Sequence, residues 1–116
     1  MSFQDLGVRA DIVAALDARG ITEPFPVQAA AIPDALAGRD ICAKAPTGSG
    51  KTIAFGIPIA ARTRRAGPRR PHALVLAPTR ELAQQIEAEL TPIAEARDLR
   101  VLSVYGGVGY EIGRAH

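Results

Sequence analysis

A glycine-rich stretch near the middle of the chain constrains the fold of everything around it. The stretch comprises Ala45, Pro46, Thr47, Gly48, Ser49, Gly50, Lys51 and Thr52. A strand-like run precedes it at residues 40–44, and an apolar helical run follows from Thr52 to Ile57. The glycines allow successive backbone N–H groups to point at one anion, and the N-terminus of the following helix adds positive potential. The pattern therefore predicts a phosphate-binding loop between a strand and a helix.

The last two side chains of this loop are predicted to act on a bound nucleotide, and they are the candidate catalytic residues. Lys51 would place an ammonium group on the β- and γ-phosphates, and Thr52 would offer a hydroxyl to the Mg²⁺ ion that accompanies ATP. The usual pattern opens with glycine, whereas this chain has Ala45, so the first turn is less permissive. The alternative is a glycine-rich turn with a solvated lysine, which the flanking patterns disfavour.

Apolar spacing predicts helices before and after the loop. The expected helices cover residues 8–19, 27–37, 52–64 and a last stretch that begins at Thr79. Pro33 is expected to kink or split the second helix, Pro58 to bend the third, and Pro92 to interrupt the last. Thr79 is the expected N-cap of that last helix.

Three short apolar runs are predicted to be buried strands, at residues 40–44, 72–77 and 100–105. Strands that alternate with helices at this spacing imply crossover connections, and hence a parallel sheet with helices on both faces. Cys42 would then be a small buried strand residue. A parallel sheet of three strands leaves edges unpaired and faces uncovered, so we expect further chain or a partner to complete it.

The composition fits a single globular domain in the cytoplasm. The 116 residues are 47% apolar and 22% charged, and the formal net charge is +2 with a pI of about 9.1. This mildly basic balance permits a nucleic-acid partner without arguing for one. The first residues lack the pattern of a signal peptide, and no apolar run is long enough to cross a membrane. A single cysteine excludes an internal disulfide and fits a reducing compartment.

Three stretches together carry a family resemblance. Residues 20–28 resemble the Q motif of DEAD-box RNA helicases, residues 45–52 are similar to their motif I, and residues 78–85 resemble their motif Ia. A Gly106-Gly107 doublet and an upstream aromatic residue, Phe3, also match the family. The resemblance implies a P-loop NTPase with a RecA-like three-layer α/β/α fold and a parallel sheet. This chain would hold the N-terminal portion of the first RecA-like domain.

The resemblance also implies how the chain is divided. Residues 1–38 would form N-terminal helices that recognise adenine, and residues 39–116 a partial RecA-like ATP-binding domain. The Gln28 amide can accept a hydrogen bond from the adenine amine and donate one to ring N7, which would select ATP over GTP. Phe3 would offer an apolar face to the base, and Ile21 stands where the family commonly has Phe. The alternative for Gln28 is a polar side chain in the first turn of a solvated helix.

By the same resemblance, the segment after the second predicted strand would hold RNA. Pro78, Thr79 and Arg80 lead into a helix, where hydroxyl, guanidinium and free N–H groups can hydrogen-bond a phosphate. The resemblance assigns that phosphate to the RNA backbone, with Gly106 and Gly107 nearby, so binding would be independent of base sequence. The alternative is an ordinary helix cap with a surface arginine.

A basic cluster separates the third predicted helix from the second predicted strand. It contains arginines at positions 62, 64, 65, 69 and 70, which we interpret as a solvated loop. The cluster leads to the N-terminal end of a strand, whereas ligands of such folds gather at the C-terminal ends. His72 and His116 have no partners at metal-binding spacing, so a zinc site is not expected.

The sequence lacks the parts that would carry turnover. It contains no Asp-Glu-Ala-Asp motif and no Ser-Ala-Thr motif, and the resemblance implies a second RecA-like domain that is also missing. The favoured hypothesis is a fragment of an ATP-dependent RNA helicase that cannot hydrolyse ATP alone. The alternative is a free-standing nucleotide- or RNA-binding module, or a non-functional remnant. An unrelated P-loop kinase or transport ATPase is disfavoured by Gln28 and by residues 78–85.

Overall fold

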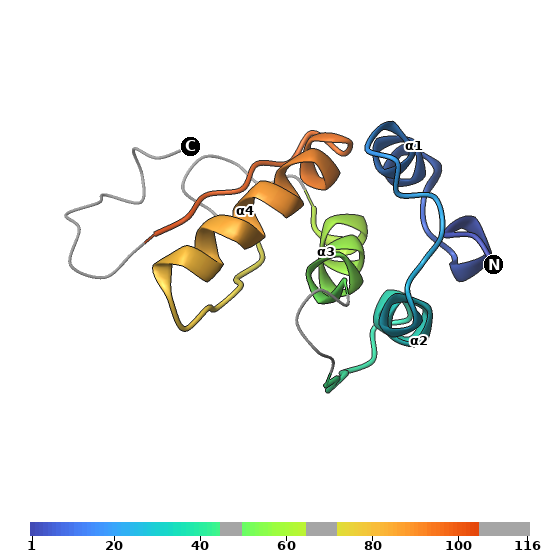
Figure 1. The fold of residues 1–116 in the computed structure, drawn as a ribbon, viewed down its shortest axis with the longest axis horizontal. Helices are drawn as coiled ribbons and strands as arrows, with labels where there is room; N and C mark the ends of the chain where they lie inside the picture. The colour runs from blue at the N-terminus through green and yellow to red at the C-terminus, as the bar shows by residue number, and fades with distance from the viewer. Residues whose placement is uncertain (45–49, 65–71, 105–116) are drawn as a thin grey trace.

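The structure is a computed structural model that describes residues 1–44, 50–64 and 72–104, which form helices joined by extended chain (Figure 1). A short 3-10 helix η1 (Gln4–Leu6) is followed by α1 (Ala10–Ala18), α2 (Pro26–Leu36), α3 (Lys51–Arg62) and α4 (Arg80–Glu95). Helix α3 lies between α2 and α4, and α1 packs beside α4. The four predicted α-helices are confirmed, with ends shifted by a few residues.

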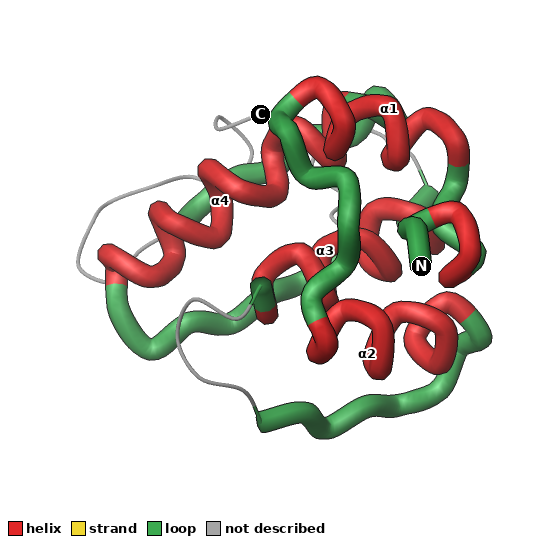
Figure 2. Tube along the Cα trace, turned by 45° about the vertical axis from the view of Figure 1, so that its right-hand side comes forward, coloured by secondary structure: helices red, strands yellow, loops and turns green. Residues whose placement is uncertain are grey.

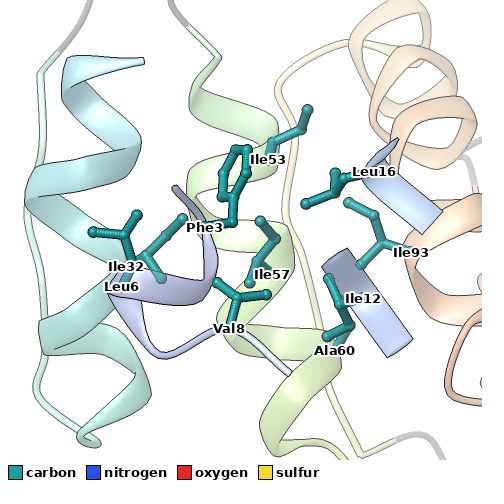
Figure 3. Packing of buried hydrophobic residues seen from close by; sticks show 10 residues of the cluster. All are labelled: Phe3, Leu6, Val8, Ile12, Leu16, Ile32, Ile53, Ile57, Ala60 and Ile93. Carbon is teal, nitrogen blue, oxygen red and sulfur yellow. The ribbon is translucent and has the colours of Figure 1, made fainter. Parts of the chain in front are cut away.

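An apolar core lies where these helices meet (Figure 3). Its buried members are Phe3, Leu6, Val8, Ile12, Leu16, Ile32, Ile53, Ile57, Ala60 and Ile93. They come from every helix, so each helix turns an apolar stripe inward. Helix α3 contributes three of them and contacts both α2 and α4, which makes it the element on which the others pack.

Local sequence signals set the ends of the helices. Pro26 starts α2, where its missing N–H costs no intrahelical bond. The Thr79 side chain accepts a hydrogen bond of 3.1 Å from the Leu82 N–H, which confirms Thr79 as the N-cap of α4. Gly20 and Gly38 follow α1 and α2 in left-handed conformations that end both helices.

The predicted interruption at Pro92 is wrong, because α4 continues through it, and α2 is likewise not split at Pro33. A proline inside a helix removes one backbone hydrogen bond and crowds the preceding turn. In α4 the carbonyl that loses its donor belongs to Ala88, which is exposed and can bond to water. Leu90 and Ile93 are both buried. Packing against the core therefore holds the helix together on either side of the proline.

None of the three predicted strands is found among the described residues (Figure 2). Residues 40–44, 72–77 and 100–104 join no strand ladder, and the remainder of the third run lies outside the described part of the chain. The parallel sheet and the three-layer arrangement are therefore also absent from that part. Leu74 and Leu76 are 81% and 84% exposed, so nothing covers these side chains. Without such cover, burial does not offset the entropy lost when a strand is ordered.

The prediction that Cys42 is buried is wrong for the same reason. Its thiol is free and exposed, on the extended segment that precedes the glycine-rich loop. Ile41 beside it is 41% exposed. A strand residue is buried only when helices cover both faces of its sheet, and no such cover forms over this segment.

One arginine ties the C-terminal end of α4 to the C-terminal end of α3. Arg97 Nη1 donates to the carbonyls of Ala60, Ala61 and Thr63, at 2.6, 2.9 and 3.0 Å. Carbonyls at a helix C-terminus have no partner within their own helix. The guanidinium also places a positive charge at the negative end of the α3 dipole. Arg97 therefore caps α3 and fixes α4 against it.

Arg97→Ala is expected to lower the free energy of unfolding by about 2 kcal/mol, because charge-assisted hydrogen bonds to three carbonyls are lost together. Urea unfolding followed by circular dichroism measures this change. Arg9→Ala is the matched control, since Arg9 is exposed and pairs with Asp11 at 3.2 Å. Such a surface pair contributes less than about 1 kcal/mol. Equal losses in the two variants would contradict the capping role of Arg97.

Candidate nucleotide-binding site

The predicted phosphate site lies at the N-terminus of α3. Gly50 is the N-cap with φ of +85°, Lys51 is the first helical residue and Thr52 the second. Lys51 is exposed and Thr52 is half-buried. The N–H groups of this first turn have no intrahelical partner, so they can bind an anion at the positive end of the helix. The remainder of the loop, Ala45, Pro46, Thr47, Gly48 and Ser49, lies outside the described residues.

Gln28 connects this end of α3 to the start of α2. Its side chain is 2% exposed, so the alternative of a solvated glutamine is wrong. Oε1 accepts a hydrogen bond from the Phe25 N–H at 2.8 Å, and Nε2 donates to the Gly50 carbonyl at 3.2 Å. The first bond caps α2, because Phe25 is the N-cap and Gln28 occupies position N3.

The two contacts of Gln28 differ in how well the sequence could have predicted them. A glutamine at the third position of a helix that begins with proline is a known capping pattern, so the bond to Phe25 had a local signal. The bond to Gly50 joins residues that are 22 positions apart. No local pattern indicates such a contact, and it was not predicted.

The amide of Gln28 keeps hydrogen-bonding capacity beyond these two contacts. A primary amide has two N–H donors and an oxygen with two acceptor lone pairs. One N–H and one lone pair remain after the bonds to Gly50 and Phe25 have formed. That remaining pair matches ring N7 and the exocyclic amine of adenine. Because the amide is buried in this conformation, a base can reach it only when neighbouring chain moves aside.

Gly50 is packed too closely against α2 to carry a side chain. A Cβ on Gly50 would overlap Nε2 of Gln28 and lie 2.9 Å from Cδ2 of Phe25. The φ of +85° also lies in the left-handed region, where residues with a Cβ are strained. The starts of α2 and α3 therefore meet at a contact that only glycine permits, and this contact fixes where α3 begins.

The two remaining residues predicted to bind adenine lie in or beside the apolar core. Phe3 is 2% exposed and belongs to the same cluster as Ile53 and Ile57 (Figure 3). Ile21 is half-buried and packs against that cluster. In this conformation Phe3, the residue before η1, packs in the core with these side chains of α3, and its contact with a base stays a prediction.

The residues predicted to bind RNA lie at the start of α4. Pro78 and Thr79 precede the helix, Arg80 is its first residue, and all three are exposed. The Thr79 oxygen accepts the hydrogen bond from Leu82, so its own hydroxyl hydrogen remains available as a donor. The Gly106-Gly107 doublet lies outside the described residues. The contact of these residues with RNA stays a prediction.

Metal clusters and membrane-spanning helices are both absent from the described residues. That part of the chain holds no group of His, Cys, Asp and Glu side chains that could bind a metal ion. It also includes no helix with the length and apolar character that a membrane span requires.

The arrangement of these helices matches that in solved structures of an RNA helicase and a DEAD box protein. The chain superimposes on the RNA helicase Prp28 of Chaetomium thermophilum, bound to ADP, with a TM-score of 0.81 and 42% identity, covering 90% of this chain and 26% of that one. A DEAD box protein of Methanococcus jannaschii gives a TM-score of 0.80 at 33% identity, covering 94% and 30%. The fold is therefore that of part of a RecA-like helicase domain.

Sequence comparison narrows this class to one family. A profile of the DEAD/DEAH box helicases matches residues 25–115. The chain is 49% identical over 115 residues to the chloroplastic DEAD-box ATP-dependent RNA helicase 3A of Zea mays, covering 92% of this chain and 15% of that protein. Against CshA of Bacillus licheniformis the identity is 43% over 116 residues, covering 98% and 23%. The chain belongs to the DEAD/DEAH box helicase family, and it spans less than a quarter of these two relatives.

Proposed function

We propose that this chain is the ATP-binding part of an ATP-dependent RNA helicase. Adenine is read by Gln28, and the phosphates are held at the N-terminus of α3 by Lys51 and by the backbone of the loop before it. Thr52 offers its hydroxyl to the Mg²⁺ ion that accompanies ATP. The similar Prp28 carries ADP, and Dbp5 of S. cerevisiae, with a TM-score of 0.73 at 30% identity, carries RNA and ADP BeF3.

The observation that carries this proposal is the link between Gln28 and Gly50. The hydrogen bond of 3.2 Å joins the residue proposed to read the base to the residue that caps the phosphate-binding helix. Because one side chain touches both parts, adenine and phosphates would be recognised at a fixed separation. The remaining N–H and lone pair of Gln28 match the N7 acceptor and the amine donor of adenine. Guanine has an acceptor in place of that amine and does not match.

We further propose that the start of α4 contacts the RNA backbone. Thr79 and Arg80 offer a hydroxyl donor and a guanidinium at the positive end of α4, which together suit a phosphate. Such contacts hold RNA without reading its bases. Both residues are exposed, which supports this proposal because an RNA strand could reach them.

Turnover is expected only in a longer protein. Phosphoryl transfer in this class relies on positioned carboxylates, a metal ion and charges from outside the phosphate loop, and the 116 residues contain no Asp-Glu-Ala-Asp motif. Alone, the chain is proposed to bind ATP without hydrolysing it. The second candidate, a free-standing nucleotide- or RNA-binding module, makes the same prediction for the isolated chain and differs in the size of the native product.

Gln28→Ala is expected to reduce the preference for ATP over GTP by about tenfold, because the hydrogen bonds that distinguish the two bases are lost. Calorimetric titration of each nucleotide measures the ratio of dissociation constants. Gln84→Ala is the matched control, since Gln84 is an exposed glutamine on α4. An unchanged ratio in Gln28→Ala would leave Gln28 with a structural role only.

A further inference from the structure

A second concave surface lies at the end of α3 opposite Lys51. It is a pocket of about 610 Å³, formed by the end of α2, by α3 from Phe55 onward, and by the extended residues 39–41, 63–64 and 72–73. Helices α2 and α3 lie side by side along this region (Figure 2). Since a helix rises 1.5 Å per residue, Arg62 at the pocket lies about 16 Å along the axis from Lys51. Arg62 therefore lies well away from Lys51, although the α3 lining begins at Phe55, about one turn after Lys51.

The side chains around this pocket carry a positive charge. Three arginines line it, Arg39, Arg62 and Arg64, and the acidic lining residue is Asp40. Arg39 is paired with Asp34 at 2.7 Å. Arg62 and Arg64 form no ion pair with any carboxylate in the part of the chain that the structure describes. Two guanidinium groups thus face one pocket without an anionic partner, which favours binding of an anion there.

Two contacts lie at the rim of the pocket. His72 Nδ1 hydrogen-bonds with the Arg64 carbonyl at 3.1 Å, which joins the two chain segments that border the pocket. The Arg62 guanidinium lies against Gly38, so close that a Cβ on Gly38 would be 3.4 Å from Nη1. The apolar side chains of Phe55, Pro58 and Ile59 supply the remainder of the α3 lining.

The C-terminus of α3 would normally disfavour an anion, because its free carbonyls carry negative potential. Here Arg97 donates to the carbonyls of Ala60, Ala61 and Thr63 and so offsets that potential. The negative potential at the end of α3 therefore opposes the positive charge of Arg62 and Arg64 less strongly.

We propose that this pocket binds a small phosphorylated ligand. The phosphate groups contact Arg62 and Arg64, and the apolar part of the ligand rests on Phe55, Pro58 and Ile59. The depression is largely open to solvent, so binding would rest on the two guanidinium groups and on the apolar surface beside them. Arg62 and Arg64 are exposed, as the interpretation of the five arginines as solvated expects, and the proposal adds a ligand to these two, while the other three lie outside the described residues.

The test uses the Lys51→Ala chain, in which the proposed nucleotide site is weakened. Inorganic tripolyphosphate is titrated while backbone amide shifts are followed by NMR. We expect saturable shifts in the second half of α3 and around His72, with none at Gly50. The double variant Arg62→Gln, Arg64→Gln should weaken this binding by tenfold or more, and Arg9→Gln, which removes an exposed arginine elsewhere, should leave it unchanged.

Three results would overturn the proposal. One is the absence of saturable shifts at the pocket, and another is an equal loss of binding in Arg9→Gln, which would indicate attraction by net charge alone. The third is binding of a single-stranded RNA oligonucleotide that depends on Arg62 while tripolyphosphate does not bind. Thermal unfolding of each variant, followed by circular dichroism, shows whether it is folded. Shifts at Gly50 would report tripolyphosphate bound at the proposed nucleotide site, so each titration distinguishes that site from the pocket.

Discussion

Lys51→Ala is expected to lower the affinity for ATP about a hundredfold. Lys51 is the first residue of α3 and is exposed, so its ammonium group is free to meet the β- and γ-phosphates at the positive end of the helix. Removing a charged partner from a phosphate costs about 1.5 to 3 kcal/mol, and each 1.4 kcal/mol corresponds to about tenfold in Kd. Isothermal titration calorimetry with Mg-ATP measures the effect.

Lys44→Ala is the matched control for this experiment. Lys44 is the other lysine of the chain, it is also exposed, and it lies just before the loop. Both variants remove one positive charge from the same region, so a general electrostatic effect would weaken ATP binding equally in both. A specific contact weakens it only in Lys51→Ala. Retention of full affinity in Lys51→Ala would remove the phosphate site from the proposed function.

Gly50→Ala is expected to lower the free energy of unfolding by about 2 to 4 kcal/mol and to weaken ATP binding at the same time. The new alanine would have to adopt a φ near +85°, and its Cβ would overlap the Gln28 amide. Gln28 is 2% exposed and hydrogen-bonded, so it has little room to move. Thermal or urea unfolding and ATP titration measure the two effects.

Two further variants separate the backbone strain of Gly50→Ala from its steric clash. Gly20→Ala has the same kind of strain, with φ of +76°, but its Cβ would have no neighbour within 4 Å. It is expected to cost about 1 kcal/mol and to leave ATP affinity unchanged. Adding Gln28→Ala to Gly50→Ala should restore part of the lost stability, because the obstructing amide is removed. If the double variant is as unstable as the sum of the two single variants, the contact between Gln28 and Gly50 does not limit position 50.

The helices of this protein were predictable because their signals are local. Apolar residues at helical spacing, Pro26 at a helix start and Thr79 at a helix cap each act within one or two turns, and the structure has all of them. The effect of Pro92 was mispredicted, since the packing of Leu90 and Ile93 outweighs the loss of one hydrogen bond. Local rules state the cost of a proline, but not the burial that offsets it.

The strands were predicted from composition and spacing, and the described residues do not form them. A parallel strand depends on neighbours that are distant in sequence and on helices that cover both faces. Leu74, Leu76 and Cys42 show what happens where that cover is missing, because all three are exposed. The apolar runs mark which residues can form a sheet, whereas pairing and cover decide whether they do.

The sequence by itself determined the family and the helices, and it predicts where a nucleotide would bind, because the motifs concerned are continuous runs of a few residues. Only the tertiary structure decided that Gln28 is buried, that it bonds to Gly50, and that Arg97 caps α3 from 34 to 37 positions away. It also brought Arg39, Arg62 and His72 to one pocket. These contacts join residues that are far apart in the chain, and their geometry exists only once the helices have packed.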